Sequence, residues 1–239
     1  SKKIVDSNSK IKLDIAPFYL SEILTYLKEW MNLKIEQSGK EVIFSVNFDN
    51  SCPSNLVFCS DKLKLKQILV NIISNSFKFT DQGFISLIIS RESIDDVPYV
   101  KFLIQDTGIG MDEATQKRLF EPYYSHNKGK HNKEGCGLGL LISQMMSASL
   151  GKPIEVSSIE GQGTKMWFYC EEQNLPHGAK MPSTVIINEF TLKKDEIASF
   201  PAKNNSMSYD QANKFTSNNI LRPRTDTMRK KGDGILDII

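Results

Sequence analysis

Two asparagines, Asn71 and Asn75, lie four residues apart and are the first residues of this chain whose spacing suits chemistry. The surrounding segment repeats Leu and Ile with helical periodicity, and Asp61 is a suitable N-cap, so we predict a long helix over residues 61–77. On that helix both asparagines and Lys78 fall on one polar stripe. The amide oxygens could bind a hydrated Mg²⁺, and Lys78 could neutralise a phosphate. A partly exposed helix edge would give the same stripe, so the pattern alone leaves both interpretations open.

A carboxylate followed by glycines is the second candidate. In residues 99–110, YVKFLIQDTGIG, an alternating apolar strand ends at Asp106, and Gly108 and Gly110 allow the backbone to approach a ligand closely. A carboxylate fixed there could accept a hydrogen bond from an exocyclic amine such as that of adenine. A strand-end turn in which Asp106 bonds its own backbone has the same sequence.

Three glycines, Gly135, Gly137 and Gly139, directly precede an apolar repeat that predicts a helix. The positive end of the helix dipole and the N–H groups of the first turn would then form a seat for an anion. The spacing matches neither the dinucleotide-binding fingerprint nor the phosphate loop that ends in G-K-[ST]. We expect this helix to carry an apolar stripe made of Leu138, Leu141, Ile142, Met145 and Met146.

Other elements must position these candidates. A further helix is expected from an N-cap at Ser21 to a stop at Gly39, and a short one from about Glu113. From about Glu171 the periodicity fades into a linker-like tail. Extended segments are expected at 10–15, 41–48, 56–60, 83–90 and 99–106, with a closing hairpin of 152–158 and 164–170.

The composition predicts one globular core with additional length, since the chain has 239 residues, 40% of them hydrophobic and 24% charged. The net charge of +2 is close to balance, so we expect no nucleic acid partner. The four cysteines lack tight metal-site spacing, and a chain of this length does not need disulfides to fold, so we expect a reducing, cytoplasmic environment. No apolar run approaches the ~20 residues of a membrane span. Because the first residue is Ser1, we expect a fragment, whose parent protein could be anchored in a membrane.

Five motifs in this order resemble the boxes of the GHKL superfamily, and most closely the ATP-binding catalytic domain of hybrid sensor histidine kinases. They are LKQILVNIISNSFKFT (65–80), DTGIG (106–110), LFEPYY (119–124), GCGLGL (135–140) and GQGTKMWF (161–168). The resemblance covers roughly residues 10–172. It implies the α+β Bergerat fold, a two-layer α/β sandwich in which about three helices pack on a mixed, mostly antiparallel sheet. ATP would lie under a mobile lid, here residues 123–134.

The resemblance also implies roles for individual residues. Asp106 would bind the adenine amino group, with Thr164 nearby, and Gly108 and Gly110 would shape the adenine pocket. Asn75, helped by Asn71, would hold Mg²⁺. The phosphates would be bound by Lys78, Gly135, Gly137, Leu138 and Gly139, and the base of the lid would be anchored by Phe120 and Pro122.

One position separates the subfamilies. GHKL relatives that hydrolyse ATP have a glutamate, which activates water, one turn before the Mg²⁺ asparagine. Here that position is Asn71, which cannot act as a base, so the site suits phosphoryl transfer to a protein side chain.

The partner of such a kinase is missing from the sequence. The histidines are His126, His131 and His177, and none resembles the phosphoacceptor of an upstream dimerisation domain. We therefore expect residues 1–9 to be the remnant of that domain and 10–172 to be the catalytic domain, inactive in autophosphorylation by itself. Residues 173–239 are expected to be a linker or tail that could lead to a receiver domain. The alternatives are a nucleotide-binding module without catalysis, and a GHKL ATPase that couples lid closure to conformational change. Zinc bound by His126, His131 and Cys136 is disfavoured because a fourth ligand is not evident.

Overall fold

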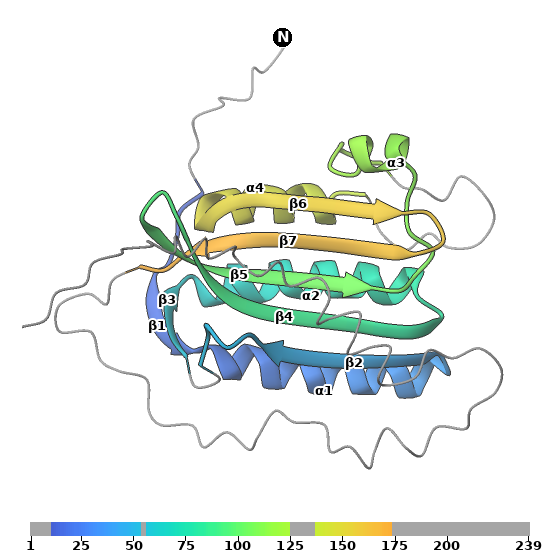
Figure 1. The fold of residues 1–239 in the computed structure, drawn as a ribbon, viewed down its shortest axis with the longest axis horizontal. Coiled ribbons are helices and arrows are strands. Elements are labelled where there is room, and N and C mark those ends of the chain that lie inside the picture. Colours follow the sequence, from blue (N-terminus) through green and yellow to red (C-terminus); the bar gives the residue numbers. More distant parts are fainter. Residues whose placement is uncertain (1–10, 54–55, 125–136, 174–239) are drawn as a thin grey trace, which may run out of the picture. The chain divides into compact units, whose positions relative to one another are not determined.

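The computed structural model describes residues 11–53, 56–124 and 137–173, all of which belong to one compact unit (Figure 1). Four helices are described: α1 (Leu20–Ser38), α2 (Lys62–Phe79), α3 (Glu113–Arg118) and α4 (Gly139–Leu150). The strands described are β1 (Ala16–Tyr19), β2 (Glu41–Phe48), β3 (Val57–Ser60), β4 (Gln82–Ile94), β5 (Val97–Asp106), β6 (Gly151–Ile159) and β7 (Gly163–Glu171).

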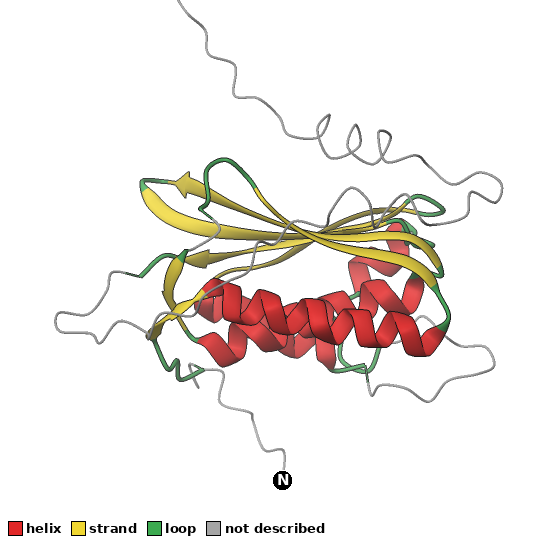
Figure 2. Ribbon diagram, turned by 90° about the horizontal axis from the view of Figure 1, so that it is seen from below, coloured by secondary structure: helices red, strands yellow, loops and turns green. Residues whose placement is uncertain are grey.

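Five strands form the main sheet in the order β2-β4-β5-β7-β6. The pair β2 and β4 is parallel, and the other three pairs are antiparallel. A separate antiparallel pair joins β1 to β3. Helices α1, α2 and α4 lie on the same face of the main sheet (Figure 2). The expected mixed, mostly antiparallel sheet packed by about three helices is confirmed.

The core lies between α2 and the central strands. Leu65, Ile68, Leu69, Ile72 and Ile73 of α2 are all fully buried. They recur at helical spacing, whereas the buried apolar residues of β4 and β5 alternate with period two, as a sheet covered on one face requires. The same pattern that predicted the elements therefore produces the two-layer packing.

Local signals located α2 well and α1 less well. Asp61 is the N-cap of α2 and accepts a hydrogen bond from Lys64 N at 3.0 Å, as expected. Gly39 ends α1 in the left-handed conformation, with φ 68°. The expected N-cap at Ser21 is wrong, because α1 begins at Leu20 after Tyr19, whose N–H donates to Glu22. Ser21 is instead buried inside the helix.

The expected strand at residues 10–15 is also wrong. The described residues 11–15 are not in a strand, and pairing starts at Ala16, opposite Ser60 of β3. Asp14 N donates to the Asp61 carboxylate at 3.0 Å, so the segment contacts the start of α2 instead of a strand.

The expected apolar stripe of α4 is wrong in part. Ile142 and Met145 are 41% and 54% exposed, whereas Ser143 and Ser147 are buried. Asn71 of α2 donates to the Ser143 hydroxyl at 2.8 Å, so α4 faces α2 through small side chains. Small residues permit close approach of two helices, and hydrophobic periodicity alone does not reveal this.

Candidate nucleotide-binding site

A cavity of about 350 Å³ lies between α2, the end of β5, α3 and the start of α4. Its walls are mostly apolar, and a few polar side chains converge in it, as in small-molecule sites. Eight of the predicted site residues line this cavity: Asn71, Asn75, Lys78, Asp106, Gly110, Gly137, Gly139 and Thr164.

Five predicted residues are not among the lining residues: Gly108, Phe120, Pro122, Gly135 and Leu138. Of these, Pro122 is exposed. Gly108 and Leu138 are chain neighbours of the lining, and Phe120 packs partly buried against the core. Gly135 lies outside the described residues, as does most of the predicted lid.

Asp106, the last residue of β5, is buried at the cavity wall with 7% of its surface exposed. Its Oδ1 atom accepts hydrogen bonds from Gly108 N at 3.0 Å and Thr164 N at 3.2 Å. Burial raises the pKa of the Asp106 carboxyl, although hydrogen bonds from Ser76, Gly108 and Thr164 act in the opposite direction. The result is an acceptor held in a fixed orientation, suited to a ligand that presents an N–H donor.

The turn after Asp106 requires glycine at two positions. A Cβ atom on Gly108 would lie 2.4 Å from Phe79 O, and one on Gly110 would lie 2.0 Å from Ile159 O. Gly110 also has φ 65°, in the left-handed region. Ile109 N donates to Phe79 O at 3.1 Å and Gly161 N donates to Ile109 O at 2.7 Å. The turn is therefore held between the end of α2 and the β6–β7 hairpin.

Behind Thr164 lies a hydrogen-bond network that the sequence did not reveal. The hydroxyls of Thr164 and Ser158 are 2.9 Å apart, and Ser158 also bonds the backbone N–H of Met111 at 2.8 Å. Gln116 of α3 donates to Ser158 O and accepts from Ser158 N, at 3.0 and 3.1 Å. Ser158 lies opposite Thr164 in the hairpin register. Correct pairing of the predicted hairpin would have pointed to Ser158, whereas Gln116 gave no signal in the sequence.

Close packing accounts for two of the three glycines at the start of α4. A Cβ on Gly139 would lie 2.6 Å from Asn71 Oδ1, and one on Gly137 would lie 2.8 Å from the backbone of Tyr123. Gly137 also has φ 68°. These contacts bring the start of α4 against α2, and Tyr123 next to Gly137. The first N–H groups of α4 have no hydrogen-bond acceptor within the helix. They lie at the edge of the cavity, which Gly139 and Leu140 line.

With this geometry in view, the chain can be compared with known proteins. The model of the family "Histidine kinase-, DNA gyrase B-, and HSP90-like ATPase" matches residues 60–174. Those residues form a domain of this ATPase family. The matched range begins just before α2 and ends just after β7, so the ATPase domain includes every residue that lines the cavity.

Curated relatives of the ATPase domain are histidine kinases. Signal transduction histidine-protein kinase BarA of Escherichia coli strain K12 is 29% identical over 162 residues, which cover 67% of this chain and 17% of BarA. Sensor histidine kinase GacS of Pseudomonas protegens is 33% identical over 169 residues, which cover 70% of this chain and 18% of GacS. The chain thus spans about a fifth of the length of these relatives.

Solved structures resemble the ATPase domain as well. Full-length ShkA in complex with AMPPNP matches with a TM-score of 0.56 and 29% identity, over 70% of this chain and 33% of ShkA. The nucleotide-free catalytic domain of histidine kinase ThkA matches with a TM-score of 0.54 and 21% identity, over 66% of this chain and 96% of that domain. The expected GHKL fold class is confirmed. Within the described ranges, no helix has the length and apolar character to span a membrane.

Proposed function

We propose that this chain binds Mg-ATP and donates the γ-phosphoryl group to a histidine of a dimerisation domain, as the catalytic part of a sensor kinase. The observation that carries the proposal is the gathering of the predicted residues around one cavity, with a fixed acceptor, Asp106, at one end and Lys78 and the start of α4 lining the same space. Three features support the individual steps.

Adenine recognition is assigned to Asp106. Its Oδ1 atom is bonded to two backbone N–H groups, which leaves the carboxylate oriented toward the cavity that it lines. The amino group of adenine donates, and a buried carboxylate accepts strongly. Thr164 and the apolar Met166 also line the cavity and would contact the base.

Magnesium would enter with the nucleotide. No group of three or more His, Cys, Asp or Glu side chains in the described ranges could hold a metal ion. Asn75 provides an amide oxygen at the cavity, and protein-bound Mg²⁺ commonly has few protein ligands, several waters and the substrate phosphates. The residues therefore fit a hydrated Mg²⁺ that would neutralise phosphate charge. Asn71, whose amide nitrogen donates to Ser143, would help mainly by fixing α4 against α2.

Transfer is favoured over hydrolysis because the described lining residues include no base that could activate water. Asp106 is their single carboxylate, and two backbone N–H groups bond it at the adenine end. The histidine nitrogen of the partner would attack the γ-phosphorus while the bond to the β-γ bridging oxygen breaks and ADP leaves. Positioning and charge neutralisation by this chain's residues would carry most of the catalysis.

The wider organisation is part of the same proposal. Residues 1–9 would be the end of the upstream dimerisation domain, 10–172 the catalytic domain, and 173–239 a tail leading to a receiver domain. The acceptor histidine would be supplied by the same or a sister protein. The catalytic domain would act in the cytoplasm, whether or not the parent protein is anchored in a membrane.

A labelling experiment tests the proposal. The chain is incubated with Mg²⁺, γ-labelled ATP and the purified dimerisation domain of GacS, with the acceptor histidine replaced by glutamine in a control domain. Acid-labile label on the domain but not on the control is expected. Confirmed ATP binding without label would favour a non-catalytic nucleotide-binding module. Steady release of phosphate by the chain alone would favour an ATPase.

A further inference from the structure

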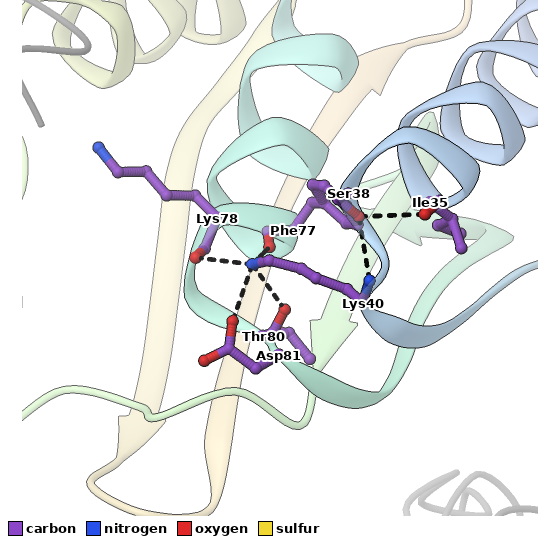
Figure 3. A network of polar contacts seen from close by, with 7 residues as sticks. All are labelled: Ile35, Ser38, Lys40, Phe77, Lys78, Thr80 and Asp81. Carbon is purple, nitrogen blue, oxygen red and sulfur yellow. Dashed lines mark hydrogen bonds and ion pairs between the residues drawn. The ribbon is translucent and has the colours of Figure 1, made fainter.

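Lys40 forms a dense set of contacts at some distance along the chain from every predicted site residue. It follows Gly39, the residue that ends α1, and directly precedes β2. Its Nζ atom donates to the backbone oxygens of Phe77 at 2.7 Å, Lys78 at 3.2 Å and Thr80 at 3.0 Å. It also forms an ion pair with Asp81 at 3.0 Å (Figure 3).

These carbonyls belong to the C-terminal end of α2, where a helix normally lacks hydrogen-bond donors for its last C=O groups. Many helices solve this with a left-handed glycine, but the C-cap of α2 is Thr80 in an extended conformation, with φ −117°. The ammonium group of Lys40 takes the place of such a cap. Its positive charge also lies at the negative end of the α2 dipole, which is the favourable arrangement.

The environment of Lys40 makes these contacts specific. Its side chain is 22% exposed, and its Nζ atom lies 4.9 Å from the centre of the Phe77 ring. Ser38 Oγ accepts from Lys40 N and donates to Ile35 O, which fixes the start of the Lys40 segment against α1. The side chain therefore leaves α1 in a defined direction and reaches across to α2 (Figure 3).

The last turns of α2 carry the phosphate-side residues of the cavity. Asn75, Lys78 and Phe79 all line it, and the Lys78 side chain extends away from Lys40 (Figure 3). Phe79 O, in the same helix end, accepts from Ile109 N. The end of α2 is thus bonded both by Lys40 and by the turn after Asp106. Lys40 is not itself a lining residue.

We propose that Lys40 is a positioning residue for the phosphate side of the nucleotide site, through the carbonyls at the end of α2. This inference rests on the proposed binding of Mg-ATP. Without the ammonium group, the last turn of α2 would be ordered in only a fraction of molecules, and the apparent Kd rises by the inverse of that fraction. The adenine end should change less, because Asp106 keeps its bonds from Gly108 N and Thr164 N, although the turn that follows it also bonds the end of α2 through Ile109 N.

The test uses Lys40→Met, which keeps an unbranched side chain over Phe77 but has no donor. The matched control is Lys62→Met, which also removes one positive charge, a carboxylate partner and a contact with a phenylalanine ring, but at the start of α2. Mg-ATP is titrated by calorimetry, and adenosine by NMR, at a temperature where circular dichroism shows each variant to be folded.

We expect Lys40→Met to weaken Mg-ATP binding roughly 3- to 30-fold. Adenosine binding should weaken clearly less than Mg-ATP binding, and Lys62→Met should affect neither ligand. Lys40→Arg, which keeps charge and donors, should restore most of the affinity for Mg-ATP. If Lys40→Met does not fold, Lys40→Gln, which keeps two N–H donors, should show a smaller loss of the same kind.

Several outcomes would overturn the inference. Unchanged Mg-ATP affinity in folded Lys40→Met would exclude a positioning role, and so would equal losses for Mg-ATP and adenosine. If Lys62→Met weakened Mg-ATP binding as much as Lys40→Met does, the weaker binding would be explained by the loss of one positive charge. In these cases the wild type still binds Mg-ATP, so these results leave the proposed function untouched. A wild type that fails to bind Mg-ATP would instead overturn the proposed function together with this inference.

Discussion

Replacing Asp106 by Asn tests the proposed adenine contact with little change in side-chain shape. In the native structure Oδ1 accepts N–H groups from Gly108 and Thr164, so the single oxygen of asparagine must stay with these two donors. The new NH₂ group then takes the place of the second carboxylate oxygen. The adenine amino group is also a donor, so it would face the asparagine NH₂ group without forming a hydrogen bond. If the asparagine amide were rotated by 180°, its NH₂ group would instead face the two backbone N–H groups of Gly108 and Thr164, which are donors as well.

The size of the effect follows from the bond that is lost. A hydrogen bond to a charged acceptor contributes about 1.5–3 kcal/mol. At about 1.4 kcal/mol for each factor of ten, the Kd for Mg-ATP should rise roughly 10- to 150-fold. The proposed phosphate contacts on α2 and α4 do not involve Asp106, so binding should weaken and not disappear.

Calorimetric titration of the wild type and of Asp106→Asn with Mg-ATP and Mg-ITP measures this directly. Hypoxanthine carries a carbonyl acceptor where adenine carries its amino group, so the asparagine NH₂ can donate to it. We expect the wild type to prefer ATP and the variant to lose or invert that preference. Circular dichroism shows whether the variant is folded.

One result would refute this reasoning. If folded Asp106→Asn binds Mg-ATP within about threefold of the wild type, the change is well below the value of about 1.5–3 kcal/mol for a hydrogen bond to a charged acceptor. The base would then be recognised by other groups, and Asp106 would serve only the turn that it bonds through Gly108 and Thr164.

Three further predictions concern stability. Because burial raises the pKa of Asp106, the wild type should lose stability as pH rises through that pKa. Asp106→Asn lacks this loss, so its free energy of unfolding, relative to that of the wild type, should increase from acid to neutral pH. Urea titrations at several pH values will measure this difference. Burial alone would raise the pKa of Asp61, but hydrogen bonds from the backbone of Asp14 and from Lys64 lower it below the usual value. Asp61→Ala should therefore cost about 1 kcal/mol at neutral pH. The difference should shrink as pH falls through the lowered pKa, because protonated Asp61 loses its ion pair with Lys64 but can still accept a hydrogen bond at the N-cap; the same titrations check this. Gly110→Ala places a Cβ 2.0 Å from Ile159 O, so both the unfolding midpoint in thermal melts and the affinity for Mg-ATP should fall, whereas Gly161→Ala, with nothing within 4 Å of its Cβ, should retain that affinity.

Sequence reasoning worked where the determinants are local. The α2 helix, its cap at Asp61 and the polar stripe of Asn71 and Asn75 follow from periodicity and from one capping side chain. These signals need no knowledge of what the helix packs against. The motif order then grouped residues that the structure brings to one cavity.

The failures have a different cause, because they depend on partners distant in the chain. The buried face of α4 includes Ser143, which accepts a hydrogen bond from Asn71, 72 residues earlier in the chain. The apolar repeat of α4 did not indicate this contact. Likewise the first strand begins at Ala16, where it pairs with Ser60, and not within residues 10–15 as predicted. Gln116 bonds Ser158 across 42 residues and left no local trace. Contacts of this kind need the topology before they can be inferred.

The order of strands in the sheet has a consequence for synthesis of the protein. Strand β7 lies between β5 and β6 in the sheet, yet it is the last strand described along the chain. The bond from Thr164 N to Asp106, across 58 residues, therefore forms only after β7 has left the ribosome. A nascent chain that ends within α4 already contains Asn75, Lys78 and Asp106 but lacks the strand that completes their pocket. Competence to bind a nucleotide should therefore be gained late in translation, when long-range strand pairing closes the sheet.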